Sequence, residues 1–220
     1  MPLGADADDL SVDPQWRFSP PLNEIPVPVA LSAVLGRSDS VAVALCGARA
    51  YTTGIELDLV IRVRTASASR PVFELINRRH QPGEPVDNLL LLGFEYADGA
   101  TVANVPARHG PPIPAPEGAD HQRPSLMERS GGGGEREYTQ SWWLAPLPPT
   151  GPLRAVFRWT AMDLPETVVE LDGTALAAAG REAETLWPWE PDPQPAEPAR
   201  NTSPTYGWFA TAGHPRKAPR

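Results

Sequence analysis

The sequence has almost none of two residue types on which many secreted proteins and enzymes depend. Of its 220 residues only Cys46 is a cysteine, so no disulfide can form within the chain. Lys217 is the only lysine among 19 basic residues, so the core lacks a Schiff-base lysine and a Walker lysine. No apolar run approaches the roughly 20 residues that span a membrane, and Met1–Leu10 is acidic without a signal-peptide pattern. These absences predict a cytoplasmic protein.

Basic residues are also fewer than acidic ones, 19 against 27, so the formal net charge is −8. Nucleic acids and anionic membranes bind cationic surfaces, so we expect neither as a partner. The four histidines, His80, His109, His121 and His214, fall in segments that we predict to be loops or tails. Their spacing with acidic residues matches no established metal site, and such segments hold ligand geometry poorly. We therefore predict no metal and no cofactor.

Proline and glycine are abundant, with 28 and 18 residues, and they indicate how the chain is organised. Proline neither donates to a β-ladder nor continues a helix, so it marks irregular segments. We predict a flexible acidic arm at 1–24, a single domain at 25–190 and a proline-rich, mostly disordered tail at 191–220. Within the domain, 106–136 is predicted to be an irregular insertion, because prolines and then four consecutive glycines dominate it.

Alternation of apolar and polar residues with a period of two predicts β-strands along the domain. The clearest strand runs from Ile55 to Arg64, with two acids and two arginines on its polar face. Val27–Leu35 is expected at a sheet edge, because prolines stand at its start. Asp98-Gly99 predicts a tight hairpin between the apolar segments on its two sides.

Residues 137–159 form the stretch around which we expect the domain to be organised. Alternation over 137–144 and 153–159, on the two sides of a proline-rich connection, predicts a β-hairpin. It carries three of the seven tryptophans, Trp142, Trp143 and Trp159, and should supply the heaviest core side chains. Trp142 and Trp143 must point to opposite faces of a strand, so one is expected in the core and the other outside, either exposed or covered.

A helix is predicted after the last strand, Thr167–Leu171. Asp172 is a favourable N-cap, and apolar residues recur at helical spacing from Leu176 to Leu186, before Pro188. Seven to nine short strands and one late helix predict an all-β, mainly antiparallel fold. We expect an immunoglobulin-like β-sandwich with long proline-rich arms, and a partly open β-barrel is the alternative.

Candidate binding residues come from three features of the sequence. An exposed tryptophan of the adjacent pair could stack on a sugar ring or anchor a partner. The charged face of 55–64 forms either cross-strand ion pairs or a recognition surface. The aromatic residues of the tail either fold back or form a short linear motif. These candidates are Trp142, Trp143, Tyr206, Trp208, Phe209, Glu56, Asp58, Arg62 and Arg64.

No nucleophile elbow, zinc-protease motif, Walker motif or dinucleotide fingerprint occurs in the sequence. We therefore interpret the chain first as a non-catalytic protein-interaction module that uses its tails or an exposed sheet face. Neither the partner's identity nor the oligomeric state follows from the sequence. The first alternative is a small-ligand or carbohydrate-binding sandwich. The second is an enzyme, whose best parts are His80, Arg78 and Arg79 beside Glu56 or Asp58.

Overall fold

The chain divides into two units, Met1–Trp189 and Glu190–Arg220. The computed structural model describes residues 15–65, 74, 76, 85–105 and 123–191. Almost all of these belong to the first unit, which carries every helix and strand named below. All four histidines and the aromatic tail residues Tyr206, Trp208 and Phe209 lie outside the described residues.

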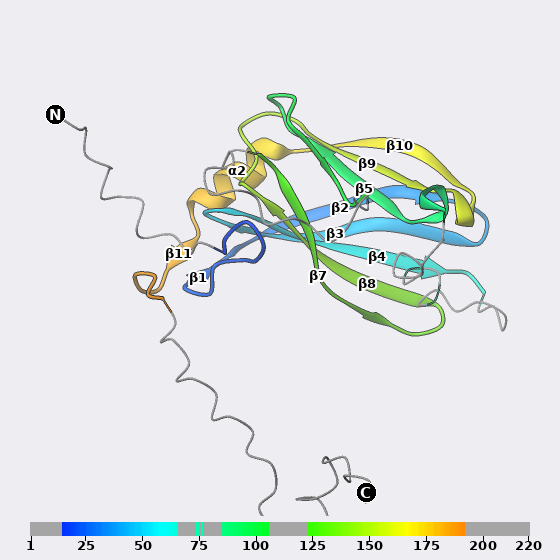
Figure 1. Cartoon of the computed structure of the whole chain (residues 1–220), viewed down its shortest axis with the longest axis horizontal. Coiled ribbons are helices and arrows are strands. Elements are labelled where there is room, and N and C mark those ends of the chain that lie inside the picture. The colour runs from blue at the N-terminus through cyan, green and yellow to red at the C-terminus, as the bar shows by residue number, and fades with distance from the viewer. Residues whose placement is uncertain (1–14, 66–73, 75, 77–84, 106–122, 192–220) are drawn as a thin grey trace, which may run out of the picture. The chain divides into compact units, whose positions relative to one another are not determined.

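Two antiparallel sheets form the body of the first unit (Figure 1). The five-stranded sheet has the order β2 (Val27–Arg37), β3 (Val41–Tyr51), β4 (Gly54–Val63), β8 (Glu137–Ala145) and β7 (Ser125–Gly133). The four-stranded sheet has the order β10 (Leu164–Leu171), β9 (Leu153–Trp159), β5 (Leu91–Glu95) and β6 (Thr101–Ala103). The short strands β1 (Glu24–Ile25) and β11 (Glu184–Thr185) pair separately. The described ranges also contain the helices η3 (Val86–Asn88), η4 (Thr160–Met162) and α2 (Gly173–Arg181).

The apolar faces of the two large sheets enclose one core. On β4, Ile55, Leu57, Leu59 and Ile61 are fully buried, so the clearest alternation in the sequence is confirmed as a half-buried strand. The opposite sheet contributes large side chains to the same cluster, including Leu92, Phe94, Phe157 and Trp159. Trp142, Trp143 and Trp159 are the largest fully buried side chains, as expected for this stretch.

The predicted all-β, mainly antiparallel, sandwich-like fold is therefore confirmed. An immunoglobulin-like topology is not confirmed, because that arrangement moves to the second sheet after two strands. Here β2, β3 and β4 are successive neighbours within one sheet. The edges β2 and β10 approach each other, and the Thr167 hydroxyl donates to the Leu35 carbonyl at 2.5 Å.

The prediction that 137–144 and 153–159 pair as a hairpin is wrong. Both segments are strands, but β8 pairs with β4 and β7, whereas β9 pairs with β5 and β10. The connection between them includes Pro146, Pro148 and Pro149, which disfavour a tight turn. It is long enough to cross the roughly 10 Å between packed sheets. The chain thus passes from one sheet to the other between Trp143 on β8 and Trp159 on β9.

The irregular insertion predicted at 106–136 is wrong in its second half, because Ser125–Gly133 forms β7 and pairs with β8. Glycine is needed there for close approach rather than for a flexible linker. A Cβ at Gly133 would lie 2.1 Å from the Glu137 carbonyl oxygen, and one at Gly131 would lie 2.7 Å from the Tyr138 hydroxyl. The first part of the predicted insertion, 106–122, lies outside the described residues.

Helix α2 packs against the five-stranded sheet and buries Leu176 and Ala179 in the core. The predicted N-cap is confirmed, because the Asp172 carboxylate accepts from the Ala175 backbone N–H at 2.9 Å. The helix ends at Arg181, five residues before the predicted end. The chain then turns extended and pairs as β11, so tertiary pairing overrides the helical periodicity.

Candidate functional site

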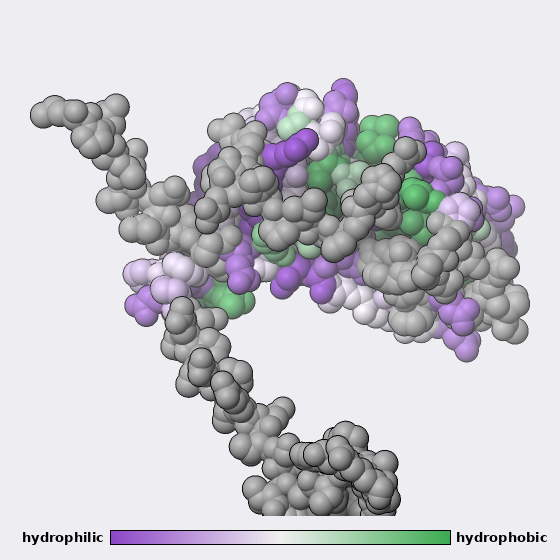
Figure 2. All heavy atoms as spheres, in the orientation of Figure 1, coloured by the Kyte–Doolittle hydropathy of each residue, from purple (hydrophilic) through white to green (hydrophobic). Residues whose placement is uncertain are grey.

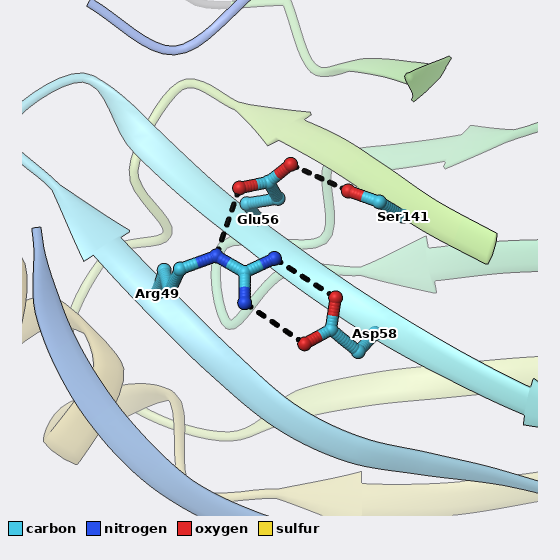
Figure 3. A network of polar contacts seen from close by, with 4 residues as sticks. All are labelled: Arg49, Glu56, Asp58 and Ser141. Carbon is cyan, nitrogen blue, oxygen red and sulfur yellow. Dashed lines mark hydrogen bonds and ion pairs between the residues drawn. The ribbon is translucent and has the colours of Figure 1, made fainter. Parts of the chain in front are cut away.

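A polar network occupies the centre of the outer face of the five-stranded sheet (Figure 3). Arg49 on β3 donates from Nε to Glu56 Oε2 at 2.9 Å, and from Nη1 and Nη2 to the two Asp58 oxygens at 3.0 and 2.9 Å. Ser141 on β8 donates to the other Glu56 oxygen at 2.5 Å. Three adjacent strands therefore meet in one charged cluster, and Arg49 uses its guanidinium fork on two carboxylates.

The network lies in a partly buried position, which strengthens its hydrogen bonds relative to open solvent. The side chains of Arg49, Glu56 and Asp58 are 38%, 16% and 24% exposed. The hydrogen bond with Asp58 is the main cause that raises the pKa of Arg49. Both carboxylates are already bound to protein groups, so the arrangement joins three strands.

The predicted cross-strand ion pairs of Glu56 and Asp58 are confirmed, but the partner Arg49 was not foreseen. Strict alternation from Val41 would place Arg49 on the core side of β3. A bulge at Cys46 and Gly47, opposite Asp58, shifts the alternation, and Gly47 has a φ of 111°. Ala48 and Ala50 then face the core and Arg49 faces outward. The glycine was the sequence signal for this bulge.

Arg62 and Arg64 lie away from this network, at the far end of β4. Arg62 pairs with Glu137 at 3.6 Å, and both side chains are more than half exposed. Together with Arg37 and Arg136 the two arginines line an open cleft of about 640 Å³. The structure therefore splits the predicted charged face into a closed ionic cluster and an arginine-lined cleft.

Neither tryptophan of the adjacent pair is exposed. Trp142 is 1% exposed in the core, and Trp143 on the outer face is 0% exposed. Trp16 and Tyr51 pack over Trp143, and its indole N–H donates to the Trp16 carbonyl at 2.8 Å. Trp16 thus holds its segment of the chain against the sheet, whereas Phe18 is half exposed. Neither the Trp142 ring nor the Trp143 ring is therefore open for stacking on a sugar.

Other chemistry is sparse in the described part of the chain. Within it, no group of three or more histidine, cysteine, aspartate or glutamate side chains is placed to hold a metal ion. Cys46, in the β3 bulge, is exposed. None of the helices in the described ranges has the length and apolar character needed to cross a membrane.

The outer face of the four-stranded sheet carries an apolar row that the sequence did not reveal. Val168, Val156, Gly93 and Ala103 are direct partners in register across β10, β9, β5 and β6. The next row is polar, with Arg154 between Glu170 and Glu95, and Arg154 pairs with Glu95 at 3.2 Å. On the other side, Arg158 pairs with Asp87 at 2.8 Å. An apolar strip thus crosses the strands between charged borders.

This strip is hollowed into a groove of about 470 Å³, which we call the apolar groove. Its lining includes Leu91, Gly93, Ala103, Val105 and Val156. The floor of the groove is low at Gly93, because this residue has no side chain. A Cβ there would lie 2.9 Å from the Val102 carbonyl oxygen. Apolar side chains gather in Figure 2 over the region where β5, β9 and β10 lie in Figure 1. Val105 in this lining is 53% exposed, and Val168 beside the groove is 60% exposed.

Comparison of the chain with protein-family models, with curated proteins and with solved structures finds no match.

Proposed function

We propose that this protein is a non-catalytic interaction module that binds an extended aliphatic segment of a partner protein in the apolar groove. The observation that carries the proposal is the in-register row Val168–Val156–Gly93–Ala103. Its last three members line a groove of about 470 Å³. Contiguous exposed apolar surface with polar borders is typical of interaction sites. Aliphatic side chains of a partner would fill the low floor at Gly93 and cover Val168.

The two outer faces differ in how far their side chains are already engaged. On the five-stranded sheet, Trp143 is covered by Trp16 and the Arg49 cluster is closed on itself. Val34 on that sheet is as exposed as Val168 on the four-stranded sheet, at 61% and 60%, but Val168 ends the apolar row whose other members line the groove. The second face therefore offers surface whose burial by a partner would be favourable.

Charge on the borders of the groove defines the partner further. One border carries Glu170, Arg154 and Glu95, and the other carries Arg158, its partner Asp87 and nearby Glu166. Each border has one more carboxylate than arginine. Complementary charge improves specificity and association rate, so we expect the aliphatic segment to be flanked by arginine or lysine.

The test is selection of short peptides from a displayed random library on the full-length protein, followed by fluorescence anisotropy with the selected peptides. The variant is Val168→Asp, and the matched control is Val34→Asp, because Val34 is 61% exposed on the outer face of the other sheet. We expect aliphatic peptides with basic flanks, weakened about tenfold or more by Val168→Asp and less than about twofold by Val34→Asp.

Three results would contradict the proposal. The first is enrichment of no peptide class, and the second is equal weakening by both substitutions. The third is a homodimer, detected by analytical ultracentrifugation, that Val168→Asp dissociates and Val34→Asp does not, since the occupant would then be a second copy of the chain. The cytoplasmic location expected from the sequence stays a prediction.

Small-ligand binding is a second candidate, and the size of the same groove favours it. A volume of about 470 Å³ lies in the range of small-molecule sites. The carbohydrate version of this candidate loses its basis, because Trp142 and Trp143 are buried. Chemical-shift changes at Gly93 and Val156 upon titration with a panel of apolar fragments, rather than peptides, would favour this candidate.

A further inference from the structure

The cleft that contains Arg62 and Arg64 has a charge opposite to that of the whole chain. It lies where the turn between β2 and β3, the end of β4 and the start of β8 meet. Four arginines line it, Arg37, Arg62, Arg64 and Arg136, against the two carboxylates of Asp39 and Glu137. The local formal charge is therefore +2, from four cations less two anions, while the chain carries −8. Clefts lined by one sign of charge concentrate the field felt by a ligand.

Most of this positive charge is not neutralised by neighbouring groups. The Arg62–Glu137 pair is long, at 3.6 Å, and more than half exposed on both sides, so solvent screens it. Arg136 donates to the backbone carbonyls of Val63 and Arg64 at 3.3 and 2.5 Å, which hold its guanidinium but do not cancel its charge. Across the described ranges, Arg37 and Arg64 have no hydrogen-bond or ion-pair partner for their side chains.

The walls of the cleft are fixed by backbone hydrogen bonds. The Arg64 N–H donates to the Ser40 carbonyl, and the Val63 N–H donates to the Arg136 carbonyl, both at 2.8 Å. In the turn, the Ser38 hydroxyl accepts from the N–H groups of Ser40 and Val41 at 3.4 and 3.3 Å. The three segments that carry the arginines are therefore tied together before any ligand binds, which lowers the entropic cost of binding.

We propose that this cleft is a binding site for a small polyvalent oxyanion carried as phosphate or carboxylate groups. Guanidinium groups match both by forming paired N–H···O bonds. Arg37 and Arg64, which have no ion-pair partner among the described residues, would contact the ligand. Arg136, whose guanidinium is held by backbone carbonyls, would contact it as well. The Ser40 hydroxyl, which shares only a 3.3 Å contact with Ser38, adds a neutral donor. The site is separate from the apolar groove, so its failure would leave the proposed function intact.

The experiment is isothermal titration calorimetry of the full-length protein with pyrophosphate in one arm and citrate in the other, at constant ionic strength set with chloride. The variant is the double substitution Arg37→Gln/Arg64→Gln. The matched control is Arg129→Gln/Arg181→Gln, which removes the same charge from positions that line neither this cleft nor the apolar groove. Thermal unfolding of each variant checks that its fold is retained.

We expect binding in at least one arm, weakened about tenfold or more by Arg37→Gln/Arg64→Gln and less than about twofold by the control. Binding of pyrophosphate alone would assign a phosphorylated ligand, binding of citrate alone a polycarboxylate, and binding of both the shared oxyanion chemistry. The proposal is overturned if neither anion binds at millimolar concentration. Equal weakening by the two double variants would overturn it as well, because it would show attraction to net charge only.

Discussion

The indole N–H of Trp143 donates to the backbone carbonyl of Trp16 at 2.8 Å, across 127 positions of the sequence. Trp143 stands on the outer face of β8, which would otherwise expose it to solvent. Tyr51 packs edge-on against it, with ring centroids 5.4 Å apart and an interplanar angle of 80°. A residue of the N-terminal arm thus completes a second apolar cluster outside the main core.

Substitution Trp16→Ala should destabilise the fold by about 1–2 kcal/mol, because it uncovers the face of Trp143 while leaving the backbone carbonyl in place. Urea unfolding monitored by circular dichroism measures the change. Trp187→Ala is the matched control, since Trp187 is 58% exposed and should contribute less than about 0.5 kcal/mol. Equal losses in the two variants would contradict the covering role of Trp16.

Arg49→Gln should cost about 1–2 kcal/mol, since it leaves the carboxylates of Glu56 and Asp58 side by side without their shared cation. Partial exposure of the cluster keeps the loss below that of a fully buried pair. Arg62→Gln, which breaks an exposed pair on the same strand face, should cost about 0.5 kcal/mol or less. Chemical denaturation at pH 7 compares them; similar losses would mean that the cluster acts as a set of ordinary surface pairs.

Tyr96 should make stability fall at alkaline pH. Burial is the main cause that raises the pKa of its phenol, which donates to the Pro146 carbonyl at 2.7 Å. Since the neutral phenol is favoured in the folded protein, the unfolded chain ionises first, at a pKa of about 10. The contribution is therefore complete below about pH 10 and is lost as the pH rises toward the folded-state value.

The variant Tyr96→Phe tests this linkage. It should be less stable by about 1 kcal/mol at neutral pH, because the hydrogen bond is lost. Above about pH 10 its stability should fall less steeply than that of the parent. Part of the fall will remain, since burial also raises the pKa of Tyr51. Parallel curves for parent and variant, from urea unfolding at a series of pH values, would refute the assignment.

Gly180→Ala should destabilise the protein although alanine is the better helix former. A Cβ at Gly180 would lie 2.6 Å from Leu147 Cδ2 and 2.7 Å from the Tyr51 carbonyl oxygen, and the carbonyl belongs to a strand. The overlap should cost about 1–3 kcal/mol, which exceeds the propensity gain of about 1 kcal/mol. On the exposed side of α2, Ala178→Gly should cost about 1 kcal/mol. A stabilising Gly180→Ala would show that the helix can shift away from the sheet.

Elements whose periodicity agrees with their burial could be predicted from the sequence. The alternation from Ile55 to Val63, the Asp98-Gly99 turn and the Asp172 cap all appear as expected. The acids Glu56 and Asp58 could be placed on a solvent-side face in the same way. Their partner Arg49 could not, because the Cys46–Gly47 bulge reverses which residues of β3 face outward.

The sequence by itself therefore determined most of the strands, the inner faces of the regular ones and the all-β class, because a period of two is a local property of the backbone. Only the tertiary structure decided which strands are neighbours. It separated β8 from β9, brought Trp16 over Trp143 and aligned Val168 with Val156, Gly93 and Ala103. Register between distant segments depends on packing across the whole sheet, and no local pattern records it.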